Sequence, residues 1–199
     1  MKKILIVVDM QNDFCGPEGS LSTPEAQAIV NKVADQIRAR ADKDTVLLVT
    51  KDTHSSNYAE TLEGKNLPVA HCIKNSYGWE LNPAIQEAIY DTRDKYHSFD
   101  SYFPYISDHI IEKPSFGSVD LQNLLYMLDD EAGMQSGDIA EITLMGLCTG
   151  ICVLSNAILA KATLPEVPVR VVKDCCACVT PKSHENAIEA MRMCQIEIV

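Results

Sequence analysis

Short runs of consecutive apolar residues recur along the chain, and apolar residues at helical spacing fill several of the intervals between them. The runs are rich in β-branched side chains, which is typical of strands buried on both faces of a parallel sheet. The six predicted strands are residues 4–8, 45–50, 109–112, 142–146, 167–173 and 195–199.

Helices are predicted between these strands. The first predicted helix begins at Thr23-Pro24. Its apolar stripe consists of Ala26, Ile29, Val30, Val33, Ala34 and Ile37. Further helices are predicted at 119–128, at 151–162 and, after Pro181, at 183–193. This alternation predicts an α/β fold, a three-layer αβα sandwich around a six-stranded, mostly parallel, Rossmann-like sheet with right-handed crossovers.

One long stretch, from Asp52 to about Pro83, has no regular pattern. Structureless loops longer than about 12–15 residues tend to be functional or disordered. This stretch contains Tyr58, Trp79, two histidines and a cysteine, a composition that argues against disorder. We therefore expect it to have a functional role.

Composition narrows the function further. A chain of 199 residues with 46% hydrophobic residues can form one core, so we expect one domain spanning residues 1–199. The formal net charge of −11, without a Lys/Arg-rich stretch, disfavours nucleic acid and anionic membranes as partners. No apolar run reaches the roughly 18 residues of a membrane span, and the one after Lys2-Lys3 is too short for a secretion signal. We expect a cytoplasmic protein whose eight cysteines are thiols.

Polar residues stand where four of the predicted strands end. Asp9 ends the first strand, Asp52 and His54 follow the second, Lys113 follows the third, and Cys152 opens the helix after the fourth. Ligands of open parallel sheets bind at the carboxyl ends of the strands. Each group alone is explained equally well as a charge that meets water, but their joint occurrence predicts a site at this edge.

Cys152 lies in the segment MGLCTGICVLSNA. Gly146 and Gly150 permit a tight strand-to-helix turn, and a thiol in the first helical turn is expected to have a lowered pKa. The backbone N–H groups of Cys148 and Cys152 are candidates for an oxyanion hole. The alternative is that Cys152 is a small buried residue without reactivity.

Together these segments resemble the isochorismatase-like cysteine hydrolase superfamily, and its nicotinamidase branch in particular. The resemblance rests on VVDMQNDF, on Lys113 in EKPSFGS and on Cys152 in GLCTGICV. It implies a catalytic triad in which Asp9 takes the proton of Cys152, the thiolate attacks an amide carbonyl, ammonia leaves and water hydrolyses the thioester, with Lys113 holding both groups. It also implies a cis peptide bond between Leu147 and Cys148.

A metal site is predicted in the stretch after the second strand. Asp52 and His54 are two residues apart, so they face the same way on an extended segment, and with His71 they suit zinc, with manganese or iron as alternatives. TKDTH followed by AHC resembles the metal-binding loop of the nicotinamidase branch. No fourth ligand is evident, because SSNYAET stands where relatives carry another histidine. The alternative is two exposed loop histidines beside an ordinary aspartate.

The substrate is expected to be a small amide, with nicotinamide as the leading candidate and isochorismate less favoured. NLPVAHC lacks the aromatic residue with which nicotinamidases stack the pyridine ring, so Phe14, Trp79 and Phe116 are the candidates to line the pocket. Relatives commonly self-associate, and we expect a homo-oligomer.

Three other functions stay open at this point. An N-carbamoyl or ureido compound is an alternative substrate for the same thiol chemistry. A catalytically idle member would act as a binding subunit. A redox or metal-cluster protein would use Cys175, Cys176 and Cys178 of KDCCACVT, although these lack paired C-x-x-C spacing.

Overall fold

Six strands form one parallel sheet in this computed structural model, which describes residues 1–96, 110–129 and 138–199. The sheet order is β3-β2-β1-β4-β5-β6, and each neighbouring pair is parallel. The strands are β1 Lys2–Val8, β2 Thr45–Asp52, β3 Ile110–Lys113, β4 Ile139–Leu147, β5 Val169–Ala177 and β6 Glu197–Ile198. The predicted sheet is confirmed; His109, the first residue of the third predicted strand, lies outside the described residues.

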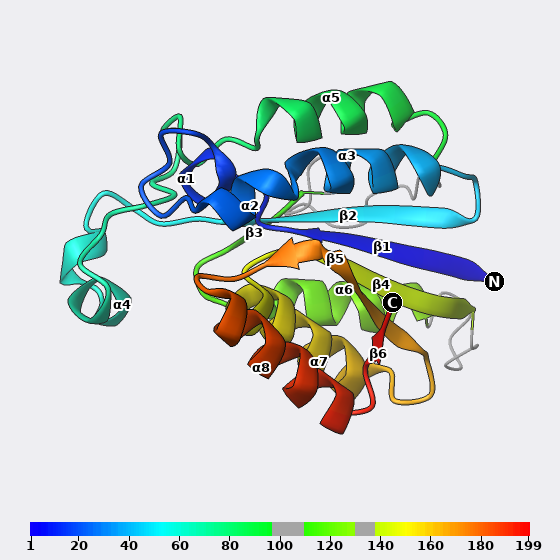
Figure 1. The fold of residues 1–199 in the computed structure, drawn as a ribbon. Coiled ribbons are helices and arrows are strands. Elements are labelled where there is room, and N and C mark those ends of the chain that lie inside the picture. The colour runs from blue at the N-terminus through cyan, green and yellow to red at the C-terminus, as the bar shows by residue number, and fades with distance from the viewer. Residues whose placement is uncertain (97–109, 130–137) are drawn as a thin grey trace.

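Helices cover both faces of this sheet (Figure 1). In the described part of the chain they are α1 Asn12–Cys15, α2 Pro24–Ala28, α3 Val30–Ala39, α4 Leu62–Asn66, α5 Pro83–Thr92, α6 Val119–Asp129, α7 Leu154–Thr163 and α8 Pro181–Met193. Helices α3 and α5 lie on one face, and α6, α7 and α8 lie on the other. The three-layer αβα architecture is therefore confirmed. None of these helices is long and apolar enough to cross a membrane.

Several helices differ from the predictions: α1, α4 and α5 were not predicted, and α7 begins only at Leu154, after a π-helical turn at Thr149–Val153. The stripe that predicted one helix is divided between α2 and α3, which meet at Ile29, although its apolar residues are buried as expected. The Thr23 side chain caps α2 by accepting the N–H of Ala26. Helix α5 was not predicted, yet Asn82 caps it and Pro83 occupies its first turn, both ordinary signals of a helix start.

The carboxyl ends of the strands gather at one edge of the sheet, from which α4 projects (Figure 1). The central strand β1 is completely buried from Ile4 to Val8, because the helical layers cover both of its faces. A polar residue that follows directly on β1 is therefore carried into the interior, at the edge where ligands bind in such sheets. This accounts for the placement of Asp9.

Candidate active site and metal centre

Asp9 and Lys113 form a completely buried ion pair at the carboxyl edge of the sheet. Lys113 ends β3, and its Nζ lies 2.6 Å from Asp9 Oδ2. The other carboxylate oxygen of Asp9 accepts a hydrogen bond from Thr50 Oγ1 at 2.6 Å. Asp9 has a φ of 49°, so the backbone turns sharply after β1. A buried charge requires such partners, and Asp9 has one on each oxygen.

Cys152 lies beside this ion pair. Lys113 Nζ donates to Cys152 Sγ at 3.6 Å and to the backbone oxygen of Ser115 at 3.0 Å. Asn156, one turn further along, donates to the Cys152 carbonyl at 2.8 Å and accepts the N–H of Ser118 at 3.0 Å. The structure thus brings together three residues that are far apart in the sequence.

Burial governs the protonation of the site. It raises the pKa of Asp9 above its ordinary value, against the attraction of Lys113. Burial also raises the pKa of Cys152, and the Asp9 charge adds to this effect while Lys113 opposes it. The expected lowering of the Cys152 pKa by the helix terminus is therefore wrong, because desolvation and a neighbouring carboxylate outweigh it. The surroundings of Cys152 therefore favour the protonated thiol.

The β4–α7 turn, residues 148–153, positions Cys152. It begins with a cis peptide bond between Leu147 and Cys148, as the family resemblance implied, and continues as the π-helical turn Thr149–Val153. The Cys148 carbonyl accepts the N–H groups of Ile151 and Val153, both at 3.1 Å. Ahead of the turn, Gly146 has a φ of 124°, and a Cβ atom there would lie 2.1 Å from the oxygen of Val8. Only glycine fits this position.

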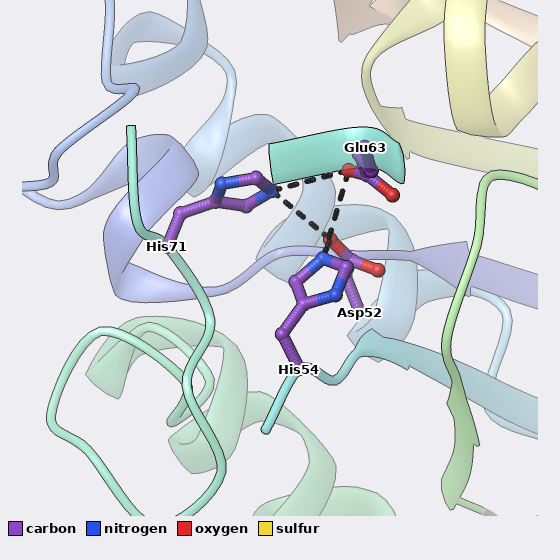
Figure 2. Close-up of side chains that lie close together, drawn as sticks. All are labelled: Asp52, His54, Glu63 and His71. Carbon is purple, nitrogen blue, oxygen red and sulfur yellow. Dashed lines mark hydrogen bonds and ion pairs between the residues drawn. The ribbon is translucent and has the colours of Figure 1, made fainter. Parts of the chain in front are cut away.

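Four side chains converge next to this site (Figure 2). They are Asp52, His54, Glu63 and His71, each of which offers one ligand atom within 4.8 Å of the others. Asp52 Oδ2 lies 3.0 Å from His54 Nε2 and 3.4 Å from His71 Nε2. Glu63 Oε1 lies 3.7 Å from each of these nitrogens. Two imidazole nitrogens and two carboxylates are a donor set that suits a divalent cation such as zinc.

Glu63 is the member of this carboxylate–histidine group that sequence reasoning missed. It lies on α4, which Thr61 caps by accepting the N–H of Gly64 at 3.0 Å. SSNYAET contains no histidine, and Glu63, two residues beyond that segment, brings a carboxylate into the group. The capping signal of α4 was the clue that the sequence offered.

Asp52 connects the two parts of the site. Its Oδ1 lies 3.6 Å from Lys113 Nζ, whereas Oδ2 faces the two histidines. Hydrogen bonds from both histidines and the Lys113 charge lower the pKa of Asp52 despite its burial. The fully buried Gln11 holds the Asp52 backbone on both sides: Oε1 accepts the Asp52 N–H at 2.7 Å, and Nε2 donates to the Asp52 carbonyl at 2.8 Å.

The three aromatic residues predicted for the pocket have different surroundings. The Phe14 ring lies 5.6 Å from the His71 ring, beside the carboxylate–histidine group. Phe116 is half exposed, and its carbonyl accepts from Asn156 below Cys152. The Trp79 ring is covered by Lys51 Nζ, 3.0 Å from its centroid. That any of them contacts substrate stays a prediction.

Comparison with known proteins places this geometry in context. The family model described as the isochorismatase domain matches residues 3–103 and 97–199. A nicotinamidase of Saccharomyces cerevisiae is 34% identical over an alignment 113 residues long, which covers 44% of this chain and 51% of that protein. A nicotinamidase/pyrazinamidase of Mycobacterium tuberculosis is 26% identical over 99% of this chain and 98% of its own.

Solved structures share the fold. A pyrazinamidase of Pyrococcus horikoshii in complex with zinc superposes with a TM-score of 0.73 at 26% identity, covering 100% of this chain and 99% of its own. A nicotinamidase/pyrazinamidase of Bacillus subtilis gives a TM-score of 0.75 at 22% identity, with both chains covered completely.

Proposed function

Because the chain belongs to the isochorismatase family, we propose that it is a cysteine-dependent amidohydrolase that cleaves the C–N bond of a small amide, nicotinamide first among the candidates, to a carboxylate and ammonia. The observation that carries this proposal is the position of Lys113 Nζ, which lies 2.6 Å from the Asp9 carboxylate and 3.6 Å from Cys152 Sγ. Relatives named for nicotinamide hydrolysis support the choice of substrate.

Proton transfer begins the reaction. Asp9 takes the thiol proton of Cys152 as the sulfur attacks the amide carbonyl, because the raised pKa of the buried thiol disfavours a free thiolate. Asp9 then passes this proton to the departing ammonia. In the second half, Asp9 deprotonates the water that hydrolyses the thioester, and this proton returns to the departing sulfur of Cys152. Lys113 stabilises the carboxylate and the sulfur anion in turn.

The β4–α7 turn supplies the oxyanion hole in this proposal. The N–H groups of Cys148 and Cys152 are assigned to the oxygen of the tetrahedral intermediate, which typically is worth about 2.7–4 kcal/mol of barrier for one donor. Gly146 and the carbonyl of Cys148, which accepts two N–H groups, fix the path of this turn.

Asp52, His54, Glu63 and His71 would hold a divalent metal, zinc by preference. A bound metal supplies Lewis acidity and an orienting ligand position for water or a substrate nitrogen. The His71 Nδ1 donates to the Val69 carbonyl at 2.8 Å, which leaves Nε2 directed at the group. A zinc-bound structural relative supports this assignment.

A screen for ammonia release tests the proposal. Purified protein is incubated with nicotinamide, pyrazinamide, small aliphatic amides, ureas and N-carbamoyl compounds, beside the Cys152→Ala variant. We expect release from the aromatic amides by the native protein alone. Release only from ureido or carbamoyl compounds would replace the substrate class, and no release from any compound would support a binding subunit.

A further inference from the structure

Two thiols that the proposed reaction does not consume lie side by side at the β4–α7 turn. Leu147 and Ala177 are the last paired residues of β4 and β5, so Cys148 and Cys178 directly follow the ends of two adjacent parallel strands. Neighbouring positions of this kind lie within the Cα separation that a disulfide tolerates. The two thiols are hydrogen-bonded to each other. Both cysteines are free in the structure.

Cys178 differs from the other buried thiols in its surroundings. Its sulfur accepts hydrogen bonds from the Cys148 thiol, from Ser183 and from the N–H groups of Gly150 and Val179, and these lower its pKa to about 5 although burial opposes the shift. The same contact raises the pKa of Cys148, so the pair shares one proton. By contrast, burial raises the pKa of Cys176 to about 12. Among the three cysteines of the KDCCACVT segment, Cys178 is therefore the one whose hydrogen bonds favour the thiolate form.

Cys178 is buried at 5% exposure, but it lines a surface cleft. A cleft of about 280 Å³ lies between α2, α3, the end of β5 and the start of α8. Both Cys178 and Cys176 line it, together with the charged or titratable residues Glu25, Lys32, Lys173, Asp174 and His184. Helix α8 begins at Pro181, so its N-terminus also faces the cleft and favours an anionic sulfur there. Thiolate character and access are the two properties that select a cysteine for oxidation.

We propose that Cys148 and Cys178 form a reversible disulfide when the protein meets a hydroperoxide. The Cys178 thiolate attacks one peroxide oxygen, the O–O bond breaks, and the leaving oxygen takes a proton to become water or an alcohol. The sulfur of Cys148 then attacks the sulfenic acid of Cys178, the S–O bond breaks, and water leaves with the Cys148 proton. The peroxide gains two electrons and the two thiols lose them.

The bond changes the β4–α7 turn. Cys178 Sγ is the acceptor for the N–H of Gly150, and a Cβ on Gly150 would lie only 3.5 Å from it, so this sulfur packs against the middle of the turn. In a disulfide, the Cys178 sulfur is uncharged and is a weaker acceptor for the N–H of Gly150. The new bond also displaces the side chain of Cys148. The expectation that oxidation abolishes amide hydrolysis rests on the proposed function, in which the N–H of Cys148 is an oxyanion donor. Formation of the disulfide is independent of the proposed function.

Mapping the disulfide tests the proposal. The native protein is treated with a small excess of hydrogen peroxide, remaining thiols are alkylated, and tryptic peptides are analysed with and without reductant. We expect a reducible link between the peptide that contains Cys148 and the peptide of residues 174–182. The link should be absent in Cys178→Ser and retained in Cys176→Ser and in the exposed-thiol control Cys194→Ser. Fragmentation of the native cross-link assigns the sulfur even where a variant folds poorly.

A link that uses Cys175 or Cys176, a link within the peptide between Cys148 and Cys152, or no link at all would overturn the proposal. A second arm follows ammonia release during oxidation. Activity should fall in step with the link and return on reduction, whereas in Cys178→Ser the loss should be at least tenfold slower. If the disulfide forms and activity is unchanged, the proposed effect of the disulfide on the β4–α7 turn is wrong. If the protein does not hydrolyse amides at all, peptide mapping still detects the disulfide, so the two proposals are tested separately.

Discussion

Burial of a carboxylate is the dominant physical feature at the scale of single residues. Asp9 is 0% exposed, and its two oxygens are taken up by Lys113 and Thr50. Desolvation raises its pKa, while both partners lower it. The base of the proposed reaction is therefore a carboxyl group whose proton affinity is set by its partners.

This arrangement predicts the pH dependence of the enzyme. Asp9 must be unprotonated to accept the thiol proton, so kcat/KM falls as the pH decreases through its raised pKa. We expect the acidic limb above the ordinary aspartate value of about 3.9. Thr50→Val removes a hydrogen bond that favours the charged form, which should move the limb upward by about 1 pH unit. A limb that stays in place or moves down in this variant would contradict the role of Asp9. The profile is measured from initial rates of ammonia release.

At this scale, the sequence predicted the polar residues that stand at strand ends, but it did not predict every member of the site or the pKa of its thiol. Asp9, Asp52 and Lys113 could be placed because parallel strands end at one edge. Glu63 could not, since it reaches the group from a short helix in an irregular stretch. The pKa of Cys152 was misjudged, because desolvation depends on how the whole fold covers the sulfur.

At the scale of elements, the β4–α7 turn depends on a single glycine. Gly146 has a positive φ, and its α-carbon faces the backbone of Val8 on the neighbouring strand. Gly150 lies in the same region, but a Cβ there would be 3.4 Å from Ala187 Cβ, in ordinary contact. The two glycines therefore form a matched pair for mutation.

Gly146→Ala should lower the free energy of unfolding by at least about 3 kcal/mol, because the backbone conformation and the overlap with Val8 are both unfavourable. Gly150→Ala should change it by less than about 1 kcal/mol. Urea unfolding followed by circular dichroism measures both. Equal effects of the two substitutions would show that the backbone at Gly146 does not require glycine.

The side chains of the carboxylate–histidine group come from different elements. Asp52 ends β2, Glu63 lies on α4, and His54 and His71 lie in the segments that follow these two elements. Elemental analysis should find about one equivalent of metal, and His71→Ala should lose most of it. His184→Ala, a histidine outside the group, should retain it. Zinc at 100 times its dissociation constant should stabilise the native protein by about 2.7 kcal/mol. Unchanged metal content in His71→Ala would contradict the proposal that these four residues bind the metal.

Element boundaries show what a sequence pattern can and cannot specify. The apolar stripe between Ala26 and Ile37 predicted which residues are buried, but not the break at Ile29, where the chain changes helix without losing the stripe. Helix α5 was overlooked because its apolar positions are fewer and its start lies at the end of an irregular stretch. The strands, with their unbroken apolar runs, were the strongest signal.

At the scale of the whole molecule, the parallel sheet gathers the candidate site residues at one edge, and the chain as a whole carries a formal net charge of −11. Candidate substrates such as nicotinamide are uncharged, so the acidic surface does not repel them. One domain spanning residues 1–199, a cytoplasmic location and self-association stay predictions. The isochorismatase family and the α/β fold are established.

The central claim is that Cys152 becomes acylated by the substrate. Native protein is mixed with excess nicotinamide, quenched in acid on the millisecond scale, and its intact mass and peptides are measured. The account predicts one acyl group on the peptide that contains Cys152, present in the exposed-thiol control Cys194→Ala and absent in Cys152→Ala. Ammonia release without any adduct, or an adduct that persists in Cys152→Ala, would contradict the account.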